Sequence, residues 1–139
     1  MFLKETNRLI DIGVLRREEV HDASEWASPS FIIPKKDESV RFLSDFRKLN
    51  AKIVRKPYPI PKILELMQTL EGFTYATTLD LNMGYYTIKL DKSAQKICTI
   101  VTPVGKYAYL RLSMGINCAP DIFQAKMNNI MFGLENVKT

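Results

Sequence analysis

Two β-rich runs on either side of a short turn constrain the fold of this chain most. The segment KICTIVTPVGKYAYLRL, residues 96–112, predicts a strand, a Pro-Val-Gly-Lys turn and a second strand, because β-branched and aromatic residues favour strands while Gly and Pro mark turns. Earlier in the chain, the alternating run VRFLSDF, residues 40–46, follows the charged turn KKDES. Together with a short apolar strand at residues 31–33 that ends at Pro34, this run predicts a β-hairpin with a basic tip.

Segments with helical periodicity separate these strands. Residues 2–12 predict a short amphipathic helix that ends at Gly13. A second helix is expected to start at Pro61 and to end at Gly72, because apolar residues recur between them at helical spacing. Pro120 predicts the start of a third helix with an apolar face. The order of helix, hairpin, helix, strands and helix predicts a mixed α+β fold.

The segment TTLDLNMGYYTIKL, residues 77–90, places one acidic side chain at the end of an apolar run. Read as a strand, it puts Leu79 and Leu81 on one face and Asp80 alone on the other. A turn through Asn, Met and Gly follows, and then a second alternating run at residues 86–90. An isolated aspartate at a strand end most often bonds the backbone of the next turn, so Asp80 taken singly favours a structural role.

Composition limits the classes of function. The chain has 139 residues and a net charge of +5, which predicts one domain and is compatible with a polyanionic partner as well as with simple solubility. It has two cysteines and one histidine, a set that argues against a zinc site or a disulfide framework and fits a reducing, intracellular compartment. Its apolar runs are all shorter than the roughly 20 residues of a membrane span, so no membrane partner is expected.

Four sequence blocks carry a family resemblance. ASPSFIIPKKD, VRFLSDFRKLN, LDLNMGYYTIKL and LSMGINCAPDIFQ occur in this order, and from about Leu9 to the last residue the chain resembles the reverse transcriptase domain of gypsy-class long-terminal-repeat retrotransposons and, more distantly, retroviral reverse transcriptases. The connector KPYPIPKI is similar to the family's link into its first palm helix. The resemblance implies right-hand polymerase fingers at 1–54 and 88–118 and an incomplete ferredoxin-like palm at 55–87 and 119–139.

The resemblance assigns chemistry to the 77–90 segment. Asp80 matches the first catalytic aspartate, which would bind both Mg²⁺ ions, with the backbone carbonyl of Leu81 assisting one of them. Two-metal phosphoryl transfer needs such hard oxygen ligands. Tyr85 matches the residue that stacks beneath the incoming sugar, where a bulky ring would exclude a 2′-hydroxyl and so select deoxynucleotides. The backbone N–H groups of the intervening turn can face the triphosphate.

The resemblance also assigns the rest of the nucleotide pocket. Lys35 and Arg41 match the basic pair on the fingers hairpin that grips the triphosphate, with Lys36 as the alternative to Lys35. Lysine would act as a point charge, whereas arginine clamps phosphate oxygens with two hydrogen bonds. Met114 and Gly115 match the block that lines the nucleotide pocket and contacts the template base. Many relatives carry Phe or Gln at the position of Met114, and a flexible thioether fills similar space.

A last set of residues matches the template side of the family's site. Pro120 and Gln124 match the start of the helix under the template strand and are the expected template contacts, with packing left open as the alternative for Gln124. Phe123 in the same helix is expected to pack rather than to contact nucleic acid. Asp45 and Arg47 match the family's Asp-Phe-Arg motif, which we interpret as mainly structural.

The family's second acidic block, Tyr-x-Asp-Asp, does not occur in residues 1–139. Asp91 and Asp121 do not occupy the corresponding place, so two Mg²⁺ ions would meet too little negative charge. We therefore interpret the chain as a fragment, inactive alone, of an RNA-directed DNA polymerase, truncated just before that block. Its expected partners are an RNA or DNA template-primer, dNTPs and the remainder of a Pol polyprotein, meaning the rest of the palm, the thumb and RNase H.

Two alternatives stay open at this point. The chain could be a non-catalytic nucleic-acid-binding remnant or co-opted module, which would bind nucleic acid without Mg²⁺ or dNTP. It could also be a degenerate gene fragment with exposed apolar surface. For a working retroelement protein we expect an intracellular location, in the cytoplasm, in retroelement particles or in the nucleus.

Overall fold

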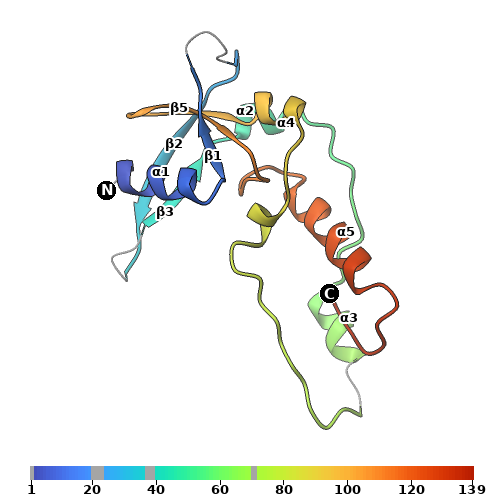
Figure 1. Cartoon of the computed structure of the whole chain (residues 1–139). Helices are drawn as coiled ribbons and strands as arrows, with labels where there is room; N and C mark the ends of the chain where they lie inside the picture. The colour runs from blue at the N-terminus through green and yellow to red at the C-terminus, as the bar shows by residue number, and fades with distance from the viewer. Residues whose placement is uncertain (1, 20–23, 37–39, 70–71) are drawn as a thin grey trace.

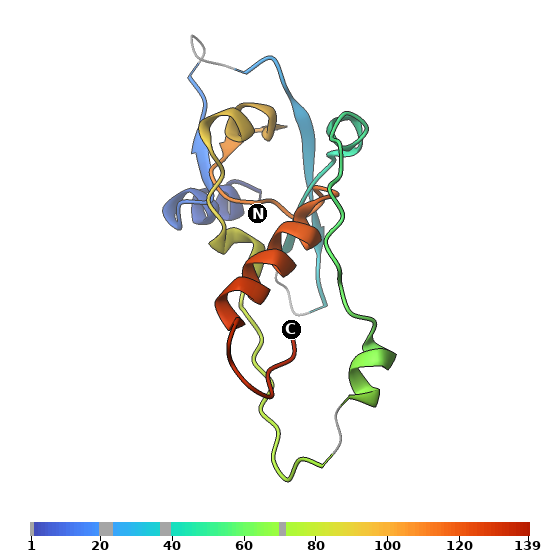
Figure 2. The same cartoon turned by 90° about the vertical axis from the view of Figure 1, so that its right-hand side faces the viewer.

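The chain divides in space into a sheet-containing end and an end made of helices and long loops (Figure 1). The structure is a computed structural model and describes residues 2–19, 24–36, 40–69 and 72–139. The sheet lies at one end with α1 (Phe2–Asp11), α2 (Arg47–Asn50) and α4 (Lys92–Ile97) near it, whereas α5 (Ala119–Met131) leads away from the sheet into the end that contains α3 (Ile63–Gln68) (Figures 1 and 2). Helices and strands mix along the chain, so the α+β class predicted from the sequence is confirmed.

Five strands form one mixed sheet in the order β1-β5-β4-β2-β3. Antiparallel pairs join β1 to β5, β5 to β4 and β2 to β3, whereas β2 and β4 run parallel. The two strand pairs expected from the sequence, β2–β3 and β4–β5, are present, and β1 was not predicted. The strands are β1 (Leu15–Arg17), β2 (Ser28–Pro34), β3 (Val40–Ser44), β4 (Thr99–Thr102) and β5 (Gly105–Tyr109).

Local sequence signals explain where the helices begin and end. Gly13 adopts a left-handed φ of 69° and ends the first helix, where the N–H of Val14 bonds the carbonyl of Leu9 at 2.8 Å. Asp91 caps α4 by accepting a hydrogen bond from the N–H of Ala94 at 2.7 Å. The helices are α1 (Phe2–Asp11), α2 (Arg47–Asn50), α3 (Ile63–Gln68), the 3₁₀ turn η2 (Gly84–Thr87), α4 (Lys92–Ile97) and α5 (Ala119–Met131).

The core lies between the sheet and the segments that cover it, and Tyr109 occupies its centre. Its ring lies 5.9 Å from that of Phe46 and 6.4 Å from that of Tyr86. Its hydroxyl bonds Ser44 Oγ at 3.0 Å, so the buried polar atom is satisfied. Burial raises the pKa of Tyr109 and that of Cys98, the latter to about 12. Both groups are therefore neutral at physiological pH.

The prediction of a strand that ends at Asp80 is wrong. Residues 74–81 have no regular secondary structure, and Leu79 and Leu81 are both exposed, at 76% and 43%. A strand forms only where another strand satisfies its backbone groups, and within the described residues the five strands of the sheet pair only with one another. The alternating pattern is real, but it meets no partner in this part of the chain.

Two further predictions need correction. The alternating run at 86–90 is not a strand, because residues 84–87 form the 3₁₀ turn η2 and only Lys89 makes an isolated bridge, with Arg111. The helix expected between Pro61 and Gly72 is shorter and starts after Lys62. Its predicted apolar residue 70 and residues 37–39 of the charged turn lie outside the described residues.

Candidate active site

The segment that carries Asp80 leads from an exposed coil into a tight turn. Asp80 itself is exposed and lies neither in a helix nor in the apolar core. Met83 follows with a left-handed φ of 54°, and the 3₁₀ turn η2 begins directly after it. Hydrogen bonds from Tyr86 N to the Met83 carbonyl at 2.9 Å and from Thr87 Oγ1 to the Gly84 carbonyl at 2.6 Å close the turn. The turn is therefore ordered although the strand before it is not formed.

Gly84 lets helix α5 approach this turn closely. A Cβ added at Gly84 would lie 2.9 Å from the ring of Phe123, a distance that no ordinary carbon contact reaches. The same ring meets Tyr85 edge-on, with 5.4 Å between ring centroids and 81° between ring planes, a favourable aromatic geometry. Phe123 thus packs under the turn, as expected, and fixes the half-buried ring of Tyr85.

The β2–β3 hairpin carries exposed cations at and next to its tip. Ile33 pairs with Arg41 across the hairpin, and Lys35 follows directly after β2. Because strand side chains alternate, Ile33 and Arg41 share a face, whereas Phe42 lies on the opposite face and is buried in the core. Lys35 and Arg41 are both exposed, and so is the alternative cation Lys36.

The loop with Met114 and Gly115 crosses the base of that hairpin. Gly115 has a φ of 96°, and an added Cβ would lie 3.3 Å from the carbonyl oxygen of Ser44 at the end of β3. Such a φ is strained for any residue with a Cβ. Asn50 bonds the Gly115 carbonyl through its side-chain amide at 2.7 Å. Met114 remains 45% exposed.

Asp121 fastens the start of α5 to the connector that precedes α3. Its carboxylate accepts hydrogen bonds from Arg55 Nε at 2.7 Å, from Arg55 Nη2 at 3.1 Å and from the N–H of Tyr58 at 3.0 Å. The Arg55 side chain and this backbone N–H hold the pKa of Asp121 below its ordinary value. The Asp121 side chain is 3% exposed, whereas that of Arg55 is 50% exposed. In the sequence, Asp121 was noted as a carboxylate that does not occupy the place of the second acidic block, and nothing in the pattern identified Arg55.

The two expected template contacts lie on α5. Pro120 is exposed in the first turn of the helix. Gln124 is half-buried, and its amide bonds Asn128 Oδ1 at 3.2 Å and Thr139 Oγ1 at 3.3 Å. These bonds place Gln124 in a polar contact within the chain rather than in open solvent.

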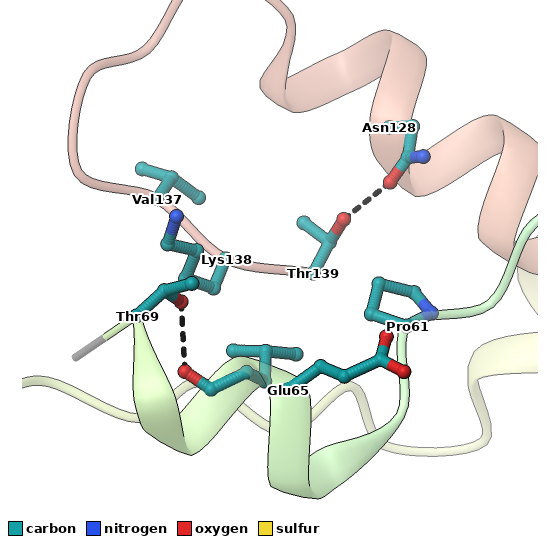
Figure 3. Close-up of a pocket in the computed structure, with 8 residues that line it drawn as sticks. Pro61, Glu65, Thr69, Asn128, Val137, Lys138 and Thr139 are labelled. Atoms are coloured by element: carbon teal, nitrogen blue, oxygen red, sulfur yellow. Dashed lines mark hydrogen bonds between the residues drawn. The ribbon is translucent and has the colours of Figure 1, made fainter.

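Two cavities lie on the α5 side of the molecule. One, of about 320 Å³, lies between α3 and the segment after α5 (Figure 3), and a hydrogen bond joins Thr139 to Asn128 at its edge. The other, of about 510 Å³, lies between α5 and residues 81–89; Leu81, Ile88, Phe123, Met127 and Ile130 supply its apolar lining, and Lys89 and Lys126 are its charged members. Of the expected site residues, only Leu81 lines either cavity.

The structure thus brings together some of the expected site residues. Helix α5 joins the Tyr85 turn, through Phe123, to the connector held by Asp121. The Met114 loop meets the end of β3 near the hairpin.

Within the described residues, no group of three or more His, Cys, Asp or Glu side chains is close enough to share a metal ion. No helix in the described part of the chain is long and apolar enough to cross a membrane.

Solved structures share this architecture. The foamy viral protease–reverse transcriptase in complex with dsDNA matches with a TM-score of 0.88 at 21% identity, over 99% of this chain and 28% of that one. The native prototype foamy virus protease–reverse transcriptase matches with a TM-score of 0.83 at 23% identity, over 96% of this chain and 18% of that one. The fold is therefore that of the fingers and part of the palm of a reverse transcriptase, as predicted.

Sequence comparison gives the family. The family model described as reverse transcriptase (RNA-dependent DNA polymerase) matches residues 33–138, and the chain belongs to this family of nucleotidyltransferase enzymes. The retrovirus-related Pol polyprotein from transposon 297 of Drosophila melanogaster is 33% identical over 137 residues, which cover 95% of this chain. The Tf2-3 polyprotein of Schizosaccharomyces pombe is 31% identical over 127 residues, which cover 91% of it.

These relatives confirm the recognition of a long-terminal-repeat retrotransposon reverse transcriptase domain, while the gypsy class stays a prediction. The chain spans only 13% of the transposon 297 polyprotein and 9% of the Tf2-3 polyprotein.

Proposed function

We propose that this chain supplies the fingers, residues 1–54 and 88–118, and part of the palm, residues 55–87 and 119–139, of an RNA-directed DNA polymerase that extends a primer with dNTPs. The observation that carries the proposal is the turn after Asp80. An exposed carboxylate, Asp80, precedes an ordered glycine turn, and the ring of Tyr85, five residues after Asp80, packs against Phe123. That arrangement suits a site in which the carboxylate of Asp80 binds the metal and the ring of Tyr85 contacts the sugar of the nucleotide.

The cations of the β2–β3 hairpin and the Met114 loop are suited to bind the parts of the nucleotide other than its sugar. Lys35 and Arg41 are both exposed on or next to the same hairpin, where two cations can bind a triphosphate through charge-assisted hydrogen bonds. We propose that Met114 and Gly115 line the nucleotide pocket, because their loop crosses the base of the same hairpin and leaves Met114 exposed.

The donor set of this chain does not fit two Mg²⁺ ions. Asp80 and the carbonyl of Leu81 are the ligands proposed here, and the described residues hold no cluster of three acidic or metal-ligating side chains. A pair of divalent ions needs several carboxylate oxygens. We therefore propose that residues 1–139 do not polymerise by themselves and that two-metal phosphoryl transfer requires carboxylates from outside these residues.

Nucleic acid is the proposed macromolecular partner, together with the remainder of a Pol polyprotein. Foamy viral protease–reverse transcriptase has been solved with dsDNA and with an RNA/DNA hybrid, and the curated relatives are Pol polyproteins. We propose that Pro120 meets the template strand and that Gln124 does so only after leaving its contacts with Asn128 and Thr139. Binding of labelled template-primer should weaken steeply with salt, because phosphate contacts release counterions; affinity unchanged by salt would contradict it.

The experiment that tests the function is single-nucleotide incorporation. The assay compares two chains, each supplied with dNTP or rNTP. The first is residues 1–139 alone, and the second is the same residues followed by the Tyr-x-Asp-Asp segment of a curated relative. Incorporation is expected only in the second chain. There Asp80→Asn should abolish it with both substrates, whereas Tyr85→Ala should raise rNTP use sharply and cost dNTP use less, because removing a steric wall changes kcat/KM for the excluded substrate.

Tyr75→Ala is the matched control, because Tyr75 belongs to the same segment and is 92% exposed. It should leave the ratio of dNTP to rNTP incorporation unchanged. If Tyr85→Ala leaves the ratio of dNTP to rNTP incorporation unchanged, Tyr85 has only a packing role and the assignment of this turn to the sugar is wrong. Incorporation by an Asp80→Asn chain would overturn the catalytic assignment.

The absence of a metal-binding cluster in the described residues favours one second candidate, a nucleic-acid-binding module without catalysis. It predicts binding of template-primer that is independent of Mg²⁺ and dNTP. The salt titration repeated with and without both additives separates the two proposals.

A further inference from the structure

A single side chain at the end of α2 holds the loop that carries Met114 and Gly115. Asn50 Nδ2 donates to the Gly115 carbonyl at 2.7 Å, and Asn50 Oδ1 accepts from the backbone N–H of Asn117 at 2.9 Å. A third bond runs from Asn117 Nδ2 to the Asn50 carbonyl at 3.3 Å. One residue of α2 thus bonds the loop at Gly115 and again at Asn117, on the C-terminal side of Met114.

A side-chain amide suits this contact. An amide donates from one atom and accepts at another, whereas a carboxylate only accepts and a hydroxyl has to do both through a single oxygen. The opposite orientation of the Asn50 amide would set its oxygen against the Gly115 carbonyl and its NH₂ against the Asn117 N–H. The hydrogen-bond partners therefore fix the amide orientation, and Asn50 acts like a short piece of paired backbone.

The loop has little freedom between its anchors. Ser113 and Ile116 are buried, at 1% and 5% exposure, whereas Met114 between them is 45% exposed. Gly115 passes so close to the Ser44 carbonyl that an added Cβ would lie 3.3 Å from it. Buried anchors on both sides, the close approach at Gly115 and the Asn50 amide together determine where Met114 is presented.

We propose that Asn50 is a positioning residue for the nucleotide pocket, an inference that rests on the proposed function of Met114 and Gly115. Its side chain does not touch the nucleotide. It holds the loop at the base of the β2–β3 hairpin, so that the loop is already in place when the nucleotide binds. Affinity depends on such preorganisation because a loop that is ordered only on binding lowers the affinity.

The test uses the 139-residue chain and follows its amide signals by NMR during a titration with dTTP and Mg²⁺. Asn50→Ala should raise the Kd for dTTP about tenfold, because the loop loses the hydrogen bonds that hold it at Gly115 and Asn117. It should also speed hydrogen exchange at the N–H of Asn117. Asn50→Gln, which restores the amide on a longer arm, should give a Kd between those of the parent and Asn50→Ala. Asn7→Ala makes the same truncation on the exposed face of α1 and should change neither quantity.

The outcomes separate this inference from the proposed function. If dTTP shifts no signal of Lys35, Arg41 or the Met114 loop in the parent chain, the nucleotide site itself is wrong and the inference falls with it. If the parent binds dTTP and both Asn50 variants bind with the parent's Kd, the site stands and the positioning role is overturned. Retained exchange protection at Tyr109 shows that a variant is folded. If Asn50→Ala does not fold, Asn50→Gln decides, because an unchanged Kd with faster Asn117 exchange also overturns the inference.

Discussion

The two proposed regions of the molecule differ sharply in how many of their large apolar side chains are buried. Among the described residues, the fingers, 1–54 and 88–118, contain every large fully buried apolar side chain. The palm part, 55–87 and 119–139, contributes the small Ala119 to this core and packs the partly buried side chains of Met83, Tyr85, Tyr86 and Ile122 against it. The palm part instead exposes Ile60, Ile63, Leu64, Met67, Phe73, Tyr75, Leu79, Leu81, Ile130, Phe132, Leu134 and Val137. The fingers therefore have a core of their own, whereas the palm part does not.

This difference teaches which residues depend on one another. Arg41 lies on a sheet with a packed core, and Lys35 and the Met114 loop lie next to that sheet, so their geometry is set within the chain. Asp80 lies on a segment with no strand partner among the described residues. Exposed large apolar side chains, when many occur in one region, mark a place where other protein packs. The proposed nucleotide side of the site is thus built in, and the proposed metal side needs further partners.

The largest expected effect comes from the core of the fingers. Tyr109→Ala should lower the free energy of unfolding by about 3–5 kcal/mol, because it removes a fully buried ring and leaves a cavity. Urea unfolding followed by circular dichroism measures the change. A loss well below 1 kcal/mol would show that Tyr109 is not central to the core.

The next effect concerns a contact within the palm part, where the start of α5 meets the connector before α3. Asp121→Asn should lower the thermal unfolding midpoint at neutral pH, because it weakens the contacts with Arg55 and Tyr58. Since folding lowers the pKa of Asp121, its contribution is fully present above the unfolded-state pKa of about 4. It is lost as the pH falls below that value through the folded-state pKa.

The difference in midpoint between the parent and Asp121→Asn should therefore shrink below about pH 4. Thermal melts of both chains from neutral to acidic pH measure it. Asp45 and Asp91 also have lowered pKa values, the former about 2 through Arg47, but they are present in both chains and cancel. A difference independent of pH would contradict the role of the Asp121 charge.

A smaller effect is expected at the turn. Gly84→Ala places a Cβ against the ring of Phe123 and should cost about 1–3 kcal/mol, the usual penalty of overpacking. Phe123→Leu in the same chain should recover part of that loss, because the two positions are in direct contact. Urea unfolding of the two single variants and the double variant gives the coupling. Strict additivity would mean that the turn does not rest on α5.

The smallest effect is expected in α3. Leu64→Ala should change the free energy of unfolding by less than about 0.5 kcal/mol, because Leu64 is 78% exposed. It should still reduce the binding of an apolar dye such as ANS, which reports exposed apolar surface. A destabilisation like that of Tyr109→Ala would remove the contrast between the two regions.

The sequence predicted best those elements that short-range sequence signals determine. The hairpins, the Gly13 helix end and the Pro120 helix start depend on residues close in sequence, and all are present. The strand at Asp80 failed because strand formation depends on a partner, which alternation does not reveal. Asn50 and Arg55 were not identified because their roles arise from contacts with residues 65 and 66 positions away.

Native-state hydrogen exchange along the whole chain tests the central claim most directly. The account predicts slow exchange for hydrogen-bonded amides of the sheet, such as the N–H of Tyr109, which bonds the Cys98 carbonyl at 3.1 Å. It predicts fast exchange for residues 72–81, and for residues 54–62 other than Tyr58, whose N–H bonds Asp121. These residues are largely exposed and lie outside regular structure. Protection of residues 72–81 equal to that of the sheet would show that the Asp80 segment is already supported within this chain, and would contradict the account.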